Sequence, residues 1–122
     1  MELILGVSSS ASLMDGLELQ YTYEDGGEVV LGFHDGCVRF EFLNGPLAGT
    51  KHADLPYLAR SLDEDVYFVR WHNKDAGSYV TLYIDLPGDR LFGSALVWYS
   101  SDEPVDLFDA AVISRVSRED AA

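Results

Sequence analysis

Apolar and polar residues alternate along much of this chain. Between Leu17 and Glu24 one side carries Leu17, Leu19, Tyr21 and Tyr23, and the other carries Glu18, Gln20, Thr22 and Glu24. A period of two puts one set of side chains in a core and the other in water, which is typical of an antiparallel strand. The Asp25-Gly26-Gly27 that follows favours a tight hairpin turn, because Asp-Gly supplies the positive φ that such a turn needs.

Further strands, separated by turn sequences, are expected along the rest of the chain. The turns are Asp35-Gly36, Asn44-Gly45-Pro46 and Pro87-Gly88-Asp89. The expected strands cover Glu28–His34, Cys37–Leu43, a weaker Gly49–Leu55, Val66–His72, Tyr79–Leu86 and Arg90–Tyr99. Two segments are ambiguous. Leu58–Leu62 is either one helical turn or a loop, and Leu107–Val116 is either an eighth strand or a helix.

Seven or eight short strands without a long amphipathic helix between them predict an all-β fold. Successive hairpins favour a small antiparallel up-and-down β-barrel of about eight strands. Such a barrel has an interior just wide enough for its own side chains or for one small ligand. We expect a single domain over residues 1–122, with an N-terminal segment over 1–14 and a frayed tail over 117–122.

The chain is strongly acidic, with a net charge of −13 from 21 acidic and 8 basic residues. This field repels nucleic acid and anionic membrane surfaces, so neither is expected as a partner. No stretch approaches the roughly 20 apolar residues that span a bilayer. The single cysteine, Cys37, has no partner for an intrachain disulfide, and Glu2 stands where a signal peptide would be basic. A cytoplasmic location is therefore expected.

Motifs for nucleotide, zinc and serine-hydrolase chemistry are absent. The chain has no Gly-rich phosphate loop, no cysteine pair and no Gly-x-Ser-x-Gly sequence. His34, His52 and His72 lie on three different expected strands. They are either separate, partly exposed side chains or ligands that converge on a metal, and the sequence pattern favours the first reading. No metal site is expected.

Aromatic residues supply the best candidates for a ligand site. Tyr21 and Tyr23 point to the same face about 7 Å apart, so their hydroxyls could both reach a polar group inside a barrel. The alternative is that both are ordinary strand residues whose hydroxyls find backbone partners. Tyr67 and Trp71 also share a face and are either core or pocket wall, whereas Arg70 falls on the opposite face.

Four stretches in this order resemble the phenolic acid decarboxylase family and its lipocalin-like (calycin) relatives, which include the MoaF-type proteins. They are Tyr21-Thr22-Tyr23-Glu24-Asp25-Gly26, Asn44-Gly45-Pro46-Leu47-Ala48-Gly49, Val66-Tyr67 with Trp71, and Leu91-Phe92-Gly93. The resemblance runs from about Asp15 to Tyr99. It implies a small antiparallel barrel, often a homodimer, that uses no cofactor. It also implies that Tyr21 and Tyr23 hold the charged end of a substrate.

Two positions depart from that family. Thr50 stands where the decarboxylases have an arginine, and Asn73 stands where they have the glutamate that transfers the proton. An amide does not titrate, so the departure argues against hydroxycinnamate decarboxylation.

Three functions stay open on the sequence alone. The first is a cofactor-free enzyme of lyase, isomerase or cyclase type, acting on a small aromatic or unsaturated, acidic ligand. Tyr21 and Tyr23 would anchor it, Thr50 and Asn73 would give neutral hydrogen bonds, and Tyr67 and Trp71 would form an apolar wall. A tyrosine, or His52 if it faces inward, would take the place of the missing general acid. The second is a lipocalin-like protein that binds a small apolar ligand without turnover. The third is a barrel filled by its own aromatic side chains, acting through its surface.

Overall fold

The computed structural model describes residues 9–10 and 12–119, and these residues form an all-β structure. Its strands are β1 (Ser9–Ser10), β2 (Leu17–Tyr23), β3 (Glu28–His34), β4 (Cys37–Phe42), β5 (Lys51–Asp63), β6 (Val66–Asn73), β7 (Ser78–Asp85), β8 (Arg90–Val97) and β9 (Val105–Arg118). No helix in the described ranges is long and apolar enough to cross a bilayer.

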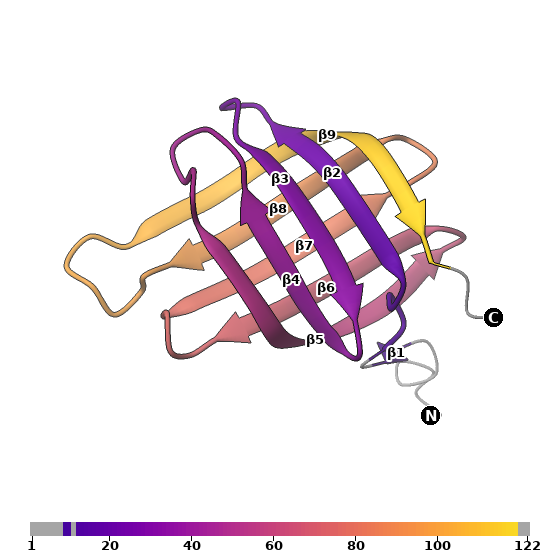
Figure 1. Cartoon of the computed structure of the whole chain (residues 1–122), viewed down its shortest axis with the longest axis horizontal. Helices are drawn as coiled ribbons and strands as arrows, with labels where there is room; N and C mark the ends of the chain where they lie inside the picture. Colours follow the sequence, from indigo (N-terminus) through magenta and orange to yellow (C-terminus); the bar gives the residue numbers. More distant parts are fainter. Residues whose placement is uncertain (1–8, 11, 120–122) are drawn as a thin grey trace, which may run out of the picture.

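Strands β2 to β9 form a closed eight-stranded antiparallel barrel. Each pairs with the next along the chain, and β9 returns to pair with β2. The predicted up-and-down topology is thereby confirmed. β2, β3 and β4 form the near wall of the barrel and β6, β7 and β8 the far wall (Figure 1). The four connections 24–27, 43–50, 74–77 and 98–104 all lie at one end.

The sequence pattern was wrong about the middle of the chain. A single strand, β5, replaces the expected strand Gly49–Leu55 and the helical turn or loop over Leu58–Leu62. Its first half pairs with β4 and its second half with β6, with irregularities in both pairings. These irregularities break the alternation of buried and exposed positions, which is why the pattern did not show one continuous strand.

The C-terminal segment is a strand, which resolves its ambiguity with a helix. β9 extends through Arg118, so Ser117 and Arg118, which were predicted to belong to a frayed tail, are part of the strand. Ser117 and Arg118 pair with Glu18 and Leu17, and the Arg118 guanidinium lies 2.9 Å from Asp65. Residues 120–122 lie outside the described part of the chain. β8 ends at Val97 rather than Tyr99 because Trp98 adopts a positive φ of 57°.

The N-terminal segment, residues 1–14, takes part in the fold where it is described. Ser9 and Ser10 pair with β5, and Met14 is buried in the core. The remaining positions of this segment, 1–8 and 11, lie outside the described residues.

The core fills the end of the barrel opposite the four connections. Leu19, Leu31, Val69, Ile84 and Leu91 are fully buried there. Polar groups also help to close this end of the barrel. The Tyr57 hydroxyl donates to the Asp15 carboxylate at 2.7 Å and accepts from the backbone N–H of Met14 at 2.9 Å. The other end of the barrel is hollow.

Candidate functional site

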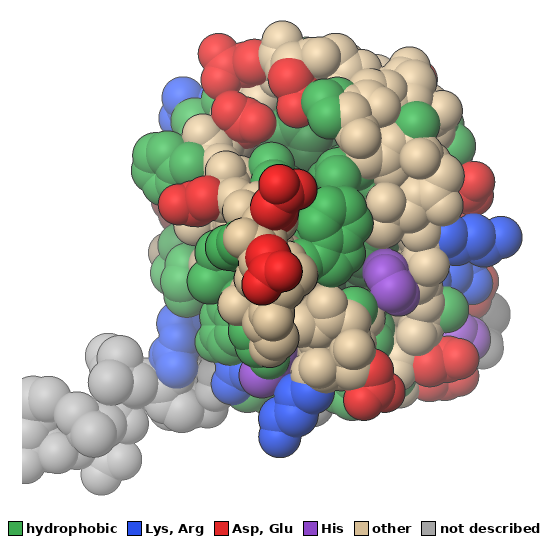
Figure 2. Space-filling model, turned by 90° about the vertical axis from the view of Figure 1, so that its left-hand side faces the viewer, with side chains coloured by type: hydrophobic (Ala, Val, Ile, Leu, Met, Phe, Trp, Pro, Cys, Tyr) green, Lys and Arg blue, Asp and Glu red, His purple; other side chains and the backbone are tan. Residues whose placement is uncertain are grey.

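The hollow end of the barrel holds a cavity of about 270 Å³. Viewed from this end, hydrophobic side chains are seen within the opening and acidic side chains around it (Figure 2). Its walls are largely apolar and aromatic, made by Phe40, Phe42, Leu47, Leu55, Trp71, Val80, Leu82 and Trp98 among others. The volume is close to the roughly 300 Å³ at which ligand pockets begin, which suits one small organic molecule.

Tyr21 and Tyr23 lie side by side on the β2 wall of this cavity. Their rings meet edge to face with centroids 5.4 Å apart, and their hydroxyls are hydrogen-bonded to each other. Burial raises the pKa of Tyr21 well above its ordinary value, and the hydrogen bond and charge of Tyr23 raise it further. The more deeply buried Tyr21 therefore stays protonated and donates a hydrogen bond to the Tyr23 oxygen. The O–H of Tyr23 is then free to donate to a ligand.

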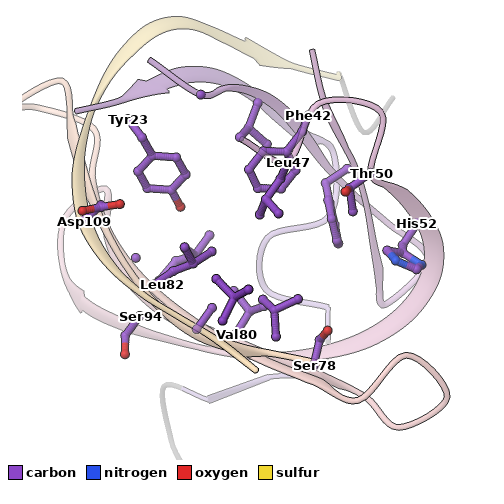
Figure 3. Close-up of a pocket in the computed structure, with 18 of the residues that line it drawn as sticks. Tyr23, Phe42, Leu47, Thr50, His52, Ser78, Val80, Leu82, Ser94 and Asp109 are labelled. Atoms are coloured by element: carbon purple, nitrogen blue, oxygen red, sulfur yellow. The ribbon is translucent and has the colours of Figure 1, made fainter. Parts of the chain in front are cut away.

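The Tyr23 hydroxyl points into the cavity (Figure 3). Burial raises the pKa of Tyr23 to about 12, offset in part by the hydrogen bond from Tyr21, and the carboxylates of Asp109 and Asp25 raise it further. At neutral pH this phenol is a hydrogen-bond donor and not an anion. A donor of this kind stabilises an oxyanion or binds a ligand oxygen.

Asp109 brings a carboxylate to the same side of the cavity. It lies on β9, directly opposite Gly93 of β8, and it lines the cavity beside Tyr23 (Figure 3). Because Gly93 has no side chain, nothing at that position covers Asp109. A second carboxylate, Asp25, lies nearer the rim and accepts a hydrogen bond from the Gly27 N–H at 2.8 Å. Asp109 is half-buried and projects from a strand of the cavity wall, whereas Asp25 lies in the connection after β2.

His52 and Asn73 form a polar pair on the opposite side. The Asn73 amide donates to Nδ1 of His52 at 3.4 Å, and its oxygen accepts from the Ala76 N–H at 3.2 Å. Because Nδ1 accepts, the neutral ring carries its proton on Nε2. Asn73 is only 8% exposed, so it orients His52 from below the surface. Thr50 lies in the connection before β5 and completes this side.

The structure brings together six of the seven residues singled out in the sequence: Tyr21, Tyr23, Thr50, His52, Trp71 and Asn73. Tyr67 is not part of the wall. It shares its inward face with Trp71 but lies at the closed end, where its hydroxyl is 3.3 Å from Asp65. The alternation along a strand shows which face a residue lies on, but not how far along the barrel axis it lies. The site occupies only the half of the barrel at the hollow end.

Asp109 and Trp98 are the main residues that the sequence pattern missed. Asp109 stood in a segment that was ambiguous between strand and helix, so its facing was not readable. When the segment is read as a strand the signal is visible, because Leu107, Asp109, Ala111 and Ile113 share one face, and Phe108 and Val112 on the other face are exposed. Trp98 follows the end of β8, where no periodicity applies.

The histidines do not converge. His34 is exposed and lies 3.1 Å from Asp35 at the closed end, and His72 faces outward with its Nε2 2.7 Å from the Tyr99 hydroxyl. Among the described residues, no group of three or more His, Cys, Asp or Glu side chains is arranged to hold a metal ion.

Comparisons with known proteins bear on the fold alone. No family model matches the chain, and no curated protein matches it. Among solved structures, the barrel is similar to a crystal structure named "putative beta-lactamase from Burkholderia vietnamiensis", with a TM-score of 0.63 and 19% sequence identity. The likeness covers 83% of this chain and 95% of that chain. It supports a small β-barrel and gives no support for membership of the phenolic acid decarboxylase family.

Proposed function

We propose that this barrel binds one small, largely apolar organic molecule and converts it without a cofactor, by lyase, isomerase or cyclase chemistry. The observation that carries the proposal is the juxtaposition of Tyr23 and Asp109 inside an apolar cavity. A carboxylate can remove a proton, and a neutral phenol can donate a hydrogen bond to the negative charge that develops. Both groups lie on neighbouring strands of a rigid sheet, so neither needs to move to act.

The apolar walls support this chemistry in a second way. They exclude water, which strengthens the hydrogen bond from Tyr23. Asp109 supplies the carboxylate that position 73, an asparagine, lacks.

The test is a thermal-shift screen of small aromatic and unsaturated acids, alcohols and amines, followed by mass spectrometry and NMR of each stabilising mixture. Binding of a ligand to the folded state alone raises the melting temperature. We expect at least one stabilising compound to return changed, and Tyr23→Phe and Asp109→Asn to slow that change about 100-fold or more. Thr22→Val, on the outer face of the same strand, is the matched control and should leave the rate unaltered.

A binding protein without turnover is the second candidate. It is favoured by the neutral Thr50 and Asn73 at the two positions where the resembling decarboxylases have arginine and glutamate. In that case stabilising compounds return unchanged, and Tyr23→Phe alters affinity only.

A chromogenic β-lactam belongs in the screen because of the name of the structural neighbour. We expect no hydrolysis, since the carboxylate that β-lactams carry would meet Asp109 and Asp25 without a compensating lysine or arginine in the cavity wall.

The homodimer that the family resemblance implies is also a proposal. The outer face of β6 to β9 offers an apolar surface for a second copy, in which Phe68 pairs with Tyr83, and Tyr83 with Phe92, across successive strands. Phe108 on this face is 85% exposed. Exposed apolar patches of this kind mark association surfaces. Sedimentation velocity of the chain and of Phe108→Ser tests it: a dimer that the substitution dissociates supports the surface, and a monomeric parent chain refutes it.

A further inference from the structure

The charges that line the cavity are all of one sign. Of the described residues that form its wall, Asp25 and Asp109 are acidic, and none is lysine or arginine. An acidic ligand, which the family resemblance led us to expect, would therefore enter a negatively charged, water-poor site without a counter-charge. Burying an unpaired charge is strongly unfavourable, because the charge loses its hydration without gaining a partner.

Asp109 itself has no counter-charge in the described part of the chain. The arginines that form ion pairs do so elsewhere, on the outer face and at the closed end: Arg39 and Arg115 with Glu18, Arg90 with Asp85, and Arg118 with Asp65. Asp109 thus presents an unpaired carboxylate to the cavity at the height where a ligand would lie. A positive charge on the ligand would complete the pair.

The walls around Asp109 suit the rest of such a ligand. Tyr23, Phe40, Phe42, Trp71 and Trp98 present aromatic rings to the cavity. Aromatic faces attract cations through the negative charge of their π-systems, and the attraction grows when water is excluded. They also pack against an apolar or aromatic body.

The surroundings of the opening have the same polarity. The connections at this end carry Glu24, Asp25, Asp75, Asp102 and Glu103, against Lys74 alone among the basic residues of these connections. Acidic side chains are visible around the opening in Figure 2. With a net charge of −13 on the whole chain, this field draws cations toward the cavity and repels anions.

We propose that the cavity takes an organic cation, a small molecule with an apolar or aromatic body and a protonated amine that pairs with Asp109. This inference rests on the proposed function, because it names the class of molecule that occupies the same cavity, and it gives the Asp109 carboxylate the role of binding the ammonium in place of the role of base. The amine would lie against the carboxylate beside the ring of Tyr23, and the body would extend toward Leu82 and Trp71.

The experiment compares three probes with one skeleton and different charges: 3-phenylpropylamine, 3-phenylpropan-1-ol and 3-phenylpropionate. Isothermal titration of the full chain at pH 7 gives the three affinities. We expect the amine to bind about tenfold or more tightly than the alcohol, and the acid to bind most weakly. Asp109→Asn should remove the amine's advantage and leave the alcohol unaffected. Asp75→Asn, which removes a carboxylate from the rim but not from the wall, should change amine affinity less than about twofold.

The outcomes separate the two proposals. If the alcohol or the acid binds in the cavity as tightly as the amine, or if Asp109→Asn leaves the amine's affinity intact, the cation inference is wrong and the proposed function stands. If none of the three probes binds, the proposed function fails for ligands of this size. Quenching of tryptophan fluorescence, compared between the chain and Trp71→Phe, shows whether a bound probe is in the cavity.

Discussion

The hydroxyl of Tyr23, on β2, lies directly over Gly93 of β8. In the sheet, β9 runs between these two strands. A Cβ built on Gly93 would come within 2.5 Å of that hydroxyl oxygen and within 3.3 Å of both the Tyr23 ring and Leu82. No side chain fits there while Tyr23 keeps its place. Gly93 therefore serves the site, because the bare backbone of β8 lets the phenol reach the cavity beside Asp109.

We predict that Gly93→Ala displaces Tyr23 and weakens binding of cavity ligands about tenfold, at a cost of roughly 1–3 kcal/mol in stability from overpacking. The double variant Tyr23→Phe/Gly93→Ala lacks the clashing oxygen. We expect it to be more stable than the sum of the two single changes predicts, by about 1 kcal/mol. Urea unfolding of the four proteins measures this coupling. Strict additivity would show that the close approach does not hold in solution.

Strands with an uninterrupted alternation could be predicted from sequence, and the rest could not. Leu17 to Tyr23 alternates without a break, and its inward face is the one expected. β5 could not be predicted as one strand. Asp54 has a positive φ of 60°, Pro56 cannot donate to a neighbouring strand, and Leu58 and Leu62 are about half exposed. Its continuity comes from partners on two sides, which local pattern does not contain.

The same limit applies to the site. Tyr21, Tyr23 and Trp71 were identifiable as inward residues, but the height at which each lies depends on how the barrel closes. Tyr67 and Trp71 share a face and lie at opposite ends of it. Asp109 and Tyr23 line the same cavity only because β9, the last strand, returns to β2. Two residues 86 positions apart in sequence are brought together by closure of the barrel, which periodicity does not show.

Tyr67 and Tyr23 lie at opposite ends of the barrel, so changes near the two should affect ligand binding differently. Both are inward tyrosines, but the Tyr67 hydroxyl contacts Asp65 at the closed end. We predict that Tyr67→Phe leaves the affinity of 3-phenylpropylamine within about twofold of the parent, whereas Gly93→Ala reduces it about tenfold. Titration calorimetry of the two variants provides the measurement. Equal losses would mean that the cavity extends into the core.

The hydrogen bonds of Tyr57 hold the closed end together. Its hydroxyl joins Asp15 and the Met14 N–H, and the Asp15 carboxylate also accepts from the Gly36 N–H at 3.1 Å. Tyr57→Phe leaves the ring in place and removes both bonds. We expect it to lower the free energy of unfolding by about 1–3 kcal/mol, because the Met14 N–H loses its acceptor. Ligand affinity should be preserved, since the change lies at the far end from the cavity. An unchanged urea midpoint would contradict the assigned network.

Alkaline pH provides a test of the tyrosine pair that needs no ligand. The pKa of Tyr23 rises to about 12 on folding, chiefly through burial, from an ordinary value of 10 in the unfolded chain. Between about pH 10 and pH 12 the unfolded state loses this proton while the folded state keeps it. The folded state therefore binds more protons, and stability falls as pH rises through this window, by up to about 1.4 kcal/mol per pH unit for each such group. Below pH 10 the contribution is constant.

We predict that Tyr23→Phe is less stable than the parent at pH 8, where Tyr21 loses its hydrogen-bond acceptor, but loses stability less steeply above pH 10. Urea unfolding at half-unit steps from pH 8 to pH 11.5 gives both slopes. Parallel slopes would mean that the Tyr23 hydroxyl is solvated in the folded protein, which would place it outside the cavity and leave Asp109 without its partner.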